Sequence, residues 1–218
     1  MTELLLIRHA ETDFNRQLRF QGHIDTPLND AGQAQAERLA ERLLDEPLDL
    51  VVSSDLQRAQ QTALPLVTRR RLPLRADTRW REQSFGVLEG LDAAGVRALH
   101  PDAWAAWQRH DADLAPAGGE TYRDFHGRVW DALRALAAAH AGARVAVVTH
   151  GGVLDMVWRG LQALPLAGPR QCAIPNTGLN RVRFDGRHVE LLVWGDDAHL
   201  AGLSQPPVTI PTPRAAGR

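Results

Sequence analysis

Three short apolar runs in the sequence each lead into a polar stretch with a basic side chain. Guanidinium groups bind phosphate oxygens with charge-assisted, often bidentate hydrogen bonds, and a histidine can serve as a covalent nucleophile. Two arginines and two histidines that met at one place would therefore suit a phosphoryl dianion, with one histidine attacking phosphorus. The runs and the basic residues after them are Leu4–Ile7 with Arg8 and His9, Leu48–Val52 with Arg58, and Val145–Val148 with His150.

The positively charged residues are all of one type. All 25 of them are arginines, and the sequence contains no lysine. This composition excludes the lysine of a Walker-type phosphate loop and catalysis through a lysine Schiff base. An anionic ligand would have to be bound by arginine, whose planar guanidinium fits both phosphate and carboxylate groups.

The apolar runs alternate with amphipathic patterns, which is typical of an α/β sheet. The runs are short and continuous, as in strands that are buried on both faces. Helices are expected over 36–44, over 54–68, with a capping box at Ser54 and Gln57, and over 121–140. Apolar runs on both sides of Asp185–Gly186 predict a terminal hairpin. We expect a three-layer α/β/α domain with a mostly parallel sheet and an antiparallel edge strand.

The chain is expected to form a single domain over residues 1–198. Residues 91–118 are rich in Ala and Trp and interrupted by Pro and Gly, so they predict a small helical excursion. Its Trp104 and Trp107 are expected to form the core of the excursion, the alternative being a pocket wall that favours an apolar leaving group. Residues 199–218 are rich in proline and predict a coil tail that packs on another part of the chain.

Charge and hydropathy exclude several classes of protein. The net charge is −1, so no strong field favours nucleic acid. No apolar run approaches the ~20 residues of a membrane span, and the N-terminus lacks the basic segment of a signal peptide. The single cysteine, Cys172, excludes an intrachain disulfide and a cysteine-cluster metal site. We expect a cytoplasmic protein, a monomer or a homodimer, with no membrane or nucleic-acid partner.

The basic stretches are expected to meet at one edge of the sheet. Open α/β sheets bind their ligands at the carboxyl ends of the strands, and each stretch follows such an end. Arg58 would lie in the first turn of its helix, which is the unfavourable end for a cation unless an anion binds there with the free backbone N–H groups. A single histidine after a strand is usually structural, so it is the recurrence at three strands that indicates a site.

Five sequence blocks occur in an order that resembles a known family. The first contains Arg8-His9-Ala10-Glu11-Thr12, Asn15 and Arg19-Phe20-Gln21-Gly22, and the others are SSDLQRAQQTA at 53–63, REQSFGVLEG at 81–90, PAGGET at 116–121 and VVTHGGV at 147–153. Together they resemble the histidine phosphatase superfamily, the phosphoglycerate-mutase-like phosphatases and mutases. One departure is Ala10, which stands where the family usually has Gly. A positive φ would strain Ala at this position, but we expect an ordinary φ.

The resemblance implies a role for each matching residue. His9 matches the nucleophile that becomes phosphohistidine, and Glu82 matches the residue that serves as general acid and then as general base. Arg8, Arg58 and His150 match the other members of the phosphate pocket. The positions that match further contacts to phosphate or substrate are Asn15, Gln21, Gly22 and Gly151.

The implied reaction is hydrolysis of a small phosphorylated metabolite with neither metal ion nor cofactor. Arg8, Arg58 and a protonated His150 would offset the roughly two negative charges of the monoester. The cations would keep His9 neutral, and a backbone carbonyl is expected to hold its other ring nitrogen. His110-Asp111 resembles a metal-site pair, but nothing near it in sequence completes a ligand set, and we expect it to be surface.

A cofactor-dependent phosphoglycerate mutase is the nearest alternative. Mutases of this family place a Tyr and a Lys where this chain has Phe85 and Ala93, and they carry an adjacent arginine pair in the excursion. Here the excursion contains only the well-separated Arg97 and Arg109. Phosphoglycerate should therefore bind weakly, and water should accept the phosphoryl group.

Two alternatives belong to other classes of protein. A non-catalytic module that binds a phosphorylated ligand is disfavoured because His9, Glu82 and His150 are all present. A dinucleotide-dependent oxidoreductase would need Gly-x-Gly-x-x-Gly after the first strand, and Arg-His-Ala-Glu-Thr stands there instead.

Overall fold

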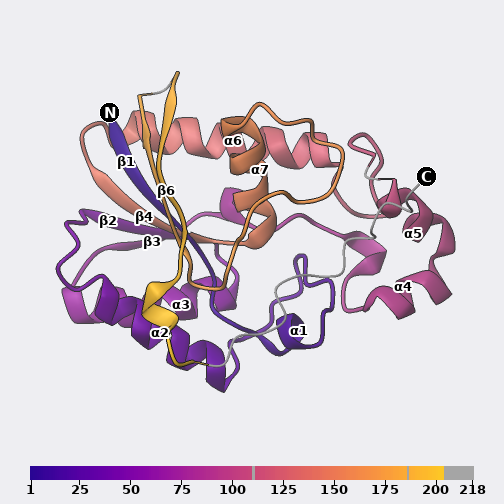
Figure 1. Ribbon diagram of the computed structural model, residues 1–218, viewed down its shortest axis with the longest axis horizontal. Coiled ribbons are helices and arrows are strands. Elements are labelled where there is room, and N and C mark those ends of the chain that lie inside the picture. The colour runs from indigo at the N-terminus through magenta and orange to yellow at the C-terminus, as the bar shows by residue number, and fades with distance from the viewer. Residues whose placement is uncertain (110, 186, 204–218) are drawn as a thin grey trace.

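A six-stranded sheet forms the centre of the computed structural model, which describes residues 1–109, 111–185 and 187–203 (Figure 1). The strands are β1 (Thr2–Arg8), β2 (Leu50–Ser53), β3 (Leu74–Ala76), β4 (Arg144–Thr149), β5 (Leu179–Phe184) and β6 (Val189–Asp196). Their order across the sheet is β3-β2-β4-β1-β5-β6. The expected alternation of strands with helices is confirmed.

The sheet is mostly parallel, as the sequence predicts. Strand β4 lies between β1 and β2 and pairs in parallel with both, and β2 pairs in parallel with β3. The terminal hairpin is also confirmed, because β5 and β6 pair antiparallel. The one antiparallel strand among the described residues, however, is β5, which lies one place in from the edge and pairs with β1. The turn at Gly186 lies outside the described residues.

Helices cover both faces of the sheet and make three layers (Figure 1). The helices are α1 (Asp13–Arg16), α2 (Asp30–Arg42), α3 (Gln57–Arg70), α4 (Ala93–Leu99), α5 (Pro101–Gln108), α6 (Tyr122–Ala139) and α7 (Gly151–Leu161). Side chains of β1 alternate between the faces: Leu4 and Leu6 pack with α6 and α7, whereas Leu5 and Ile7 pack with α2 and α3. Burial of each such leucine contributes about 1.5–3 kcal/mol, so both faces anchor the strand.

Helix α3 begins later than the sequence predicts. Leu56 occupies the N-cap position without a side-chain hydrogen bond, so the capping box expected at Ser54 is wrong. A distant side chain supplies the acceptor instead, because Asp25 Oδ1 accepts a hydrogen bond from Gln57 N at 2.7 Å. A local sequence pattern cannot reveal a cap that comes from another part of the chain. Arg58 nevertheless lies in the first turn, as expected.

The other two expected helices are confirmed. Thr121 caps α6, since its Oγ1 accepts a hydrogen bond from Asp124 N at 2.9 Å. Helix α2 extends further toward the N-terminus than its apolar pattern, and Asn29 Oδ1 caps it by accepting from Gly32 N at 2.9 Å.

Helices α4 and α5 form the expected excursion, at one end of the molecule (Figure 1). Its tryptophans pack against a small cluster that contains Phe20, Leu88 and Val96. Trp104 and Trp107 stack with ring centroids 5.3 Å apart. The expected role of this pair in the core of the excursion is therefore confirmed, although the pocket described below also reaches Trp107.

The last described residues include a short 3₁₀ turn, Ala198–Leu200, whose Leu200 is buried. Most of the tail, residues 204–218, and His110 lie outside the described residues, as do the expectations about them. The domain boundary at residue 198, the cytoplasmic location and the monomeric or dimeric state stay predictions.

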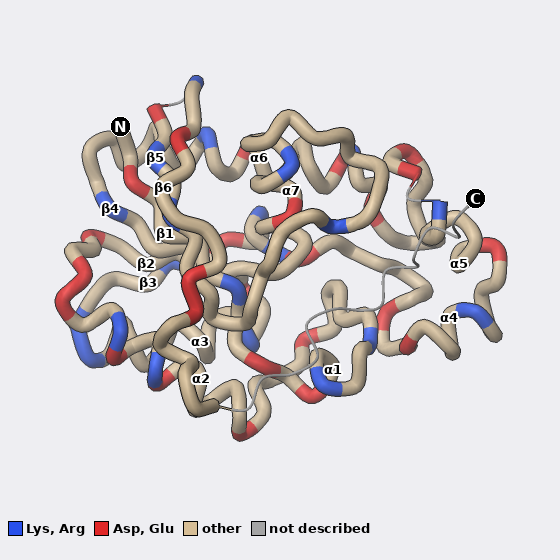
Figure 2. The backbone as a smooth tube through the Cα atoms, viewed as in Figure 1, with Lys and Arg blue, Asp and Glu red and all other residues tan. Residues whose placement is uncertain are grey.

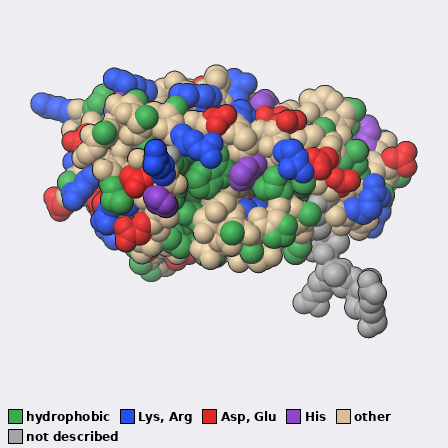
Figure 3. All heavy atoms as spheres, turned by 90° about the horizontal axis from the view of Figure 1, so that it is seen from above, with side chains coloured by type: hydrophobic (Ala, Val, Ile, Leu, Met, Phe, Trp, Pro, Cys, Tyr) green, Lys and Arg blue, Asp and Glu red, His purple; other side chains and the backbone are tan. Residues whose placement is uncertain are grey.

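Acidic and basic residues are interspersed along the chain (Figure 2), and their side chains are mixed on the face of the molecule that Figure 3 shows. No helix within the described ranges has the length and apolar character to cross a membrane. The expectation that nucleic acid is not a partner stays a prediction.

Candidate active site

The carboxyl ends of β1 and β4 lie level, and this places two histidines side by side. Arg8 pairs with Thr149 in the parallel register, and His9 N donates a hydrogen bond to the Thr149 carbonyl at 2.7 Å. The ring centroids of His9 and His150 are 5.2 Å apart. Strand β2 ends on the far side of β4, so α3 brings Arg58 to the same edge. The basic strand ends therefore meet, as the sequence predicts.

The His9 ring is held in an orientation suited to nucleophilic attack. Its Nδ1 atom lies 2.7 Å from the Ala10 carbonyl oxygen, so Nδ1 carries the hydrogen and Nε2 keeps its lone pair. Burial is the largest cause that lowers the pKa of His9 well below its usual value, and the charges of Arg58 and Arg8 lower it further. The imidazole is therefore neutral near pH 7. The expected carbonyl partner of the second ring nitrogen is confirmed.

Two arginines, the half-buried Arg8 and the fully buried Arg58, lie beside His9. Burial, with smaller effects of neighbouring cations, lowers the pKa of Arg8 to about 10, and burial lowers the pKa of Arg58 to about 10. Both guanidinium groups therefore remain charged at neutral pH. Arg58 is fixed by donating to the carbonyl oxygens of Gly22 at 2.8 Å and Ile24 at 2.9 Å. Arg8 Nη1 donates to the Ile174 carbonyl at 2.8 Å.

His150 is neutral in the free protein, whereas the expectation of a protonated ring concerns the substrate-bound protein and stays a prediction. Burial and then the charge of Arg58 lower the pKa of His150 well below its usual value. The sequence could not reveal this, because burial depends on the packing of β4 and α7. His150 does not line the cavity, whereas the other expected site residues, including His9, do. Its ring is fully buried next to that of His9.

Glu82 reaches the same site from the loop after β3. Its Oε2 accepts a hydrogen bond from Gly152 N at 3.0 Å, and its Oε1 accepts one from Gln83 N at 3.0 Å. Gly152 leaves room for the carboxylate, because a Cβ atom at that position would lie 2.2 Å from Glu82 Oε1 and would displace it. The first turn of α7 therefore fixes the carboxylate at the cavity wall.

The expected accessory residues line the cavity as well. Asn15 Oδ1 accepts hydrogen bonds from Thr12 N and Thr12 Oγ1, both at 3.1 Å, which leaves its amide N–H groups for other acceptors. Gln21 Oε1 accepts from Thr12 Oγ1 at 2.9 Å. Gly22 has a φ of 51°, a conformation that favours glycine. Gly151 lies at the N-terminus of α7, where a backbone N–H is free of intrahelical bonding.

Ala10 is accommodated without strain. It is not among the residues with positive φ, so the expected ordinary backbone is confirmed. Its N–H donates to Thr62 Oγ1 at 2.9 Å, and its side chain packs against Leu28 and Ala36. The methyl group thus adds an apolar contact beneath the loop.

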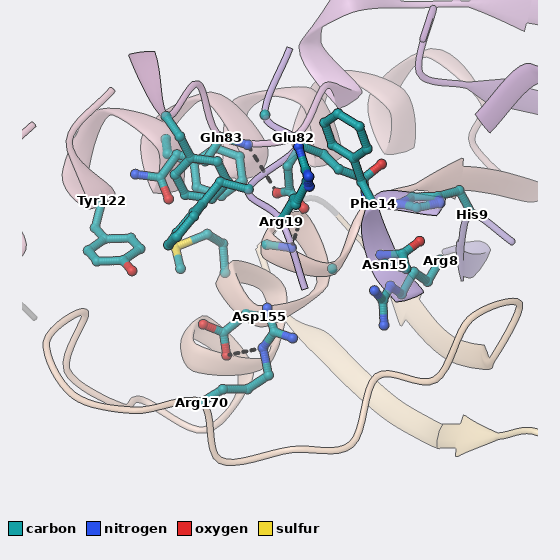
Figure 4. Close-up of a pocket in the computed structure, with 18 of the residues that line it drawn as sticks. Arg8, His9, Phe14, Asn15, Arg19, Glu82, Gln83, Tyr122, Asp155 and Arg170 are labelled. Atoms are coloured by element: carbon teal, nitrogen blue, oxygen red, sulfur yellow. Dashed lines mark hydrogen bonds and ion pairs between the residues drawn. The ribbon is translucent and has the colours of Figure 1, made fainter. Parts of the chain in front are cut away.

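The cavity, of about 160 Å³, extends past the residues that the sequence singles out (Figure 4). Its further wall contains four polar groups that sequence reasoning missed, namely Tyr122, Asp155, Arg159 and Arg170. Asp155 could have been noticed, since an acid interrupts the apolar pattern of α7. Arg170 lies in an irregular loop after α7, where no periodic pattern points to a site.

Buried donors without partners converge around this cavity. Within the described part of the chain, no hydrogen-bond partner exists for the Nε–H groups of Arg8, Arg58 and Arg170 on the cavity wall. The neutral ring of His150, which is not on that wall, adds one further N–H without a partner. An unpaired buried donor costs about 1–3 kcal/mol, so a group of them is complementary to a bound anion. Among the described residues, no group of three His, Cys, Asp or Glu side chains fits a metal ion.

Comparisons with known proteins agree with this geometry. A model of the histidine phosphatase superfamily (branch 1) matches residues 4–197. The chain is 39% identical over 203 residues to phosphoglycerate mutase-like protein 4 of Arabidopsis thaliana, which covers 91% of this chain and 86% of that protein. It is 35% identical over 206 residues to a metal-independent phosphoserine phosphatase of Arabidopsis thaliana, with 93% and 85% covered.

A solved structure is also similar to the chain. It is a mycobacterial glucosyl-3-phosphoglycerate phosphatase in complex with VO3. The TM-score is 0.77 and the sequence identity 36%, and the match covers 88% of this chain and 98% of the other.

Proposed function

The chain belongs to the histidine phosphatase superfamily (branch 1), and on this basis we propose that it hydrolyses small phosphomonoesters through a phosphohistidine at His9, without a metal ion. The observation that carries the proposal is the neutral, oriented His9 ring beside two charged arginines on one cavity wall. The phosphatase names of two similar proteins support hydrolysis as the reaction.

Substrate binding places the phosphate dianion among the unpaired donors. Arg8 and Arg58 bind its oxygens, and the N–H of Gly151 adds a donor at the positive end of α7. The negative charge of the ligand favours protonation of the neighbouring His150, because an opposite charge raises the pKa of an imidazole. The ring then donates to a phosphate oxygen.

The first chemical step transfers the phosphoryl group to His9. Nε2 attacks phosphorus in line with the leaving oxygen, so that the P–N bond forms as the ester P–O bond breaks. Protonated Glu82 gives its proton to the departing alkoxide, which leaves as the alcohol. The Nδ1–H of His9 stays bonded to the Ala10 carbonyl, which stabilises the ring as it becomes more positive.

The second step returns the enzyme to its starting state. The Glu82 carboxylate removes a proton from water, and the hydroxide attacks phosphorus as the P–N bond breaks. Inorganic phosphate leaves, and Glu82 is protonated again. The arginines offset the charge of the transferring group in both steps, which is the role a metal ion plays in other phosphatases.

Water as the final acceptor is supported by the residues at two positions, Phe85 and Ala93. Phe85 lines the cavity and packs edge-on against Phe20, with ring centroids 5.2 Å apart. A phenyl ring cannot donate a hydrogen bond to a substrate held for return transfer, and Ala93 carries no charge. Arg170, which no sequence pattern indicated, adds a positive charge to the cavity wall. Weak binding of phosphoglycerate is therefore not part of this proposal.

The test is a turnover screen in excess chelator. Sugar phosphates, nucleotides and phosphoglycerates are supplied, and both phosphate release and conversion of 3- to 2-phosphoglycerate with added bisphosphoglycerate are measured. We expect phosphate release from several esters, unchanged by chelator and faster than any mutase turnover. Activity that disappears in chelator and returns with magnesium would refute metal independence, and dominant mutase turnover would refute hydrolysis as the main reaction.

A further inference from the structure

Arg170 lines the cavity but has no role in the mechanism above. Its side chain is 26% exposed and lines the cavity, and its Nε atom is buried with no hydrogen-bond partner among the described residues. An arginine held at a cavity wall with an unpaired donor is suited to bind an anionic group. The question is whether that group is the reacting phosphate or another part of the substrate.

The loop that carries Arg170 is held by a buried arginine, so the side chain starts from a fixed backbone. Arg159, on α7, is 3% exposed, and its two Nη atoms donate hydrogen bonds of 2.6 to 3.2 Å to the loop. The carbonyl groups that accept them belong to Pro165, Ala167, Gly168 and Pro169. Arg170 follows directly after the last of these.

The guanidinium of Arg170 is oriented from both sides. Its Nε atom lies 3.9 Å from Asp155 Oδ1, and Figure 4 shows the two side chains facing each other. Its Nη2 and Nη1 atoms lie 3.6 and 3.7 Å from the position that a Cβ atom would take at Gly151, and Arg8 Nε lies 3.5 Å from the same point. Arg170 and Arg8 therefore both lie beside Gly151 at the start of α7.

Arg170 acts on a point farther from the nucleophile than Arg8 does. Arg8 adjoins His9 at the end of β1, whereas Arg170 Nε faces Asp155, one helical turn along α7 from Gly151. The reacting phosphate contacts His9, so Arg170 meets the part of the substrate that extends from the phosphate along the cavity. Tyr122, Arg170 and Arg8 all line the cavity, and in the view of Figure 4 Tyr122 and Arg8 lie on opposite sides of Arg170.

We propose that Arg170 binds a carboxylate on the leaving group, so that the preferred substrates are phosphomonoesters of small hydroxy acids. This inference rests on the proposed phosphatase function. A carboxylate fits better than a second phosphate because of the local charge. Asp155 lies 3.0 Å from Arg159 and 3.9 Å from Arg170, so the cluster carries one net positive charge, which matches a monoanion.

The experiment compares ester pairs that differ in the carboxylate. The pairs are 3-phosphoglycerate with glycerol 3-phosphate, and O-phosphoserine with O-phosphoethanolamine. For at least one pair, kcat/KM should be higher for the carboxylate, and Arg170→Gln should lower it for that ester by about 10- to 100-fold while changing its partner little. Arg170→Lys should keep part of the preference, because it keeps the charge but not the planar fork.

Controls separate this inference from the proposed function. Arg97→Gln removes an exposed cation from α4 and should leave the preference unchanged. Thermal unfolding of Arg170→Gln checks its fold, and the preference of the wild-type protein is informative by itself. Equal kcat/KM within both pairs, or a larger preference for fructose 1,6-bisphosphate over fructose 6-phosphate, would overturn the inference while leaving phosphatase activity intact. Release of phosphate from none of these esters would overturn the proposed function itself.

Discussion

Replacing Glu82 with Gln removes the proposed proton donor and leaves nearly the same shape. Both carboxylate oxygens accept a backbone N–H at 3.0 Å, from Gly152 and from Gln83. An amide has one oxygen, so one of these donors will face an NH2 group and lose its acceptor. The variant should therefore be less stable by about 1–3 kcal/mol, which denaturant unfolding would measure.

The rate effect should depend on the leaving group. A positioned proton donor is worth about 10²–10⁴-fold, so Glu82→Gln should slow hydrolysis of an alkyl phosphate by that factor. A nitrophenolate leaves without protonation, so phosphoryl transfer from nitrophenyl phosphate should be nearly as fast as in the wild type. Because Glu82 also activates water, rapid mixing of the variant with nitrophenyl phosphate should give a burst of nitrophenol followed by slow turnover.

Stopped-flow absorbance measures the burst, and kcat/KM is compared for the two esters. Glu89→Gln is the control, since Glu89 is a nearby carboxylate whose Oε1 accepts from His23 N and Phe85 N, each at 3.0 Å. This control should affect both esters alike. Equal losses of kcat/KM for alkyl and nitrophenyl esters in Glu82→Gln, with no burst, would refute the acid role and leave Glu82 as a structural residue.

Two further predictions concern the buried histidines and the start of α7. Burial lowers the pKa values of His9 and His150, so unfolding takes up protons at pH values below the unfolded pKa of about 6.5. The free energy of unfolding should therefore fall with decreasing pH by up to about 2.7 kcal/mol per pH unit for the pair, and this dependence should be absent above about pH 6.5. Equal free energies from urea unfolding at pH 7.5 and pH 5.5 would contradict this prediction. Gly152→Ala would place Cβ 2.2 Å from Glu82 Oε1 and should cause the same selective loss of alkyl phosphatase activity as Glu82→Gln. The control Gly127→Ala, with open space around its Cβ, should not cause this loss. Normal kinetics in Gly152→Ala would show that the position of the carboxylate is unimportant.

The sequence predicted the parts of the site that follow strands. Short apolar runs identify buried parallel strands, and the level carboxyl ends of such strands bring His9 and His150 together whatever the loops do. The Nδ1 partner of His9 was also predictable, because a local carbonyl is the usual way to fix an imidazole tautomer.

The features that sequence reasoning missed depend on contacts between distant segments. Asp25 caps α3 from a loop far away in the chain, so the helix start was placed too early. The neutral state of His150 is a result of burial, which only the packed structure determines. Arg170 lies in a loop whose path is fixed by the hydrogen bonds of Arg159 to four carbonyl groups between Pro165 and Pro169, and such a path leaves no periodic pattern in the sequence.

The most direct test of the account is to trap the phosphoryl group on His9. The protein is mixed with an ester labelled in the phosphate, quenched within milliseconds, and analysed for bound label by peptide mapping. The account predicts label that is labile in acid, stable in base and located on His9, and it predicts that His9→Ala loses both label and turnover. His188→Ala, which removes an 85% exposed histidine, should retain both. Label on another residue, or substantial turnover in His9→Ala, would contradict the account.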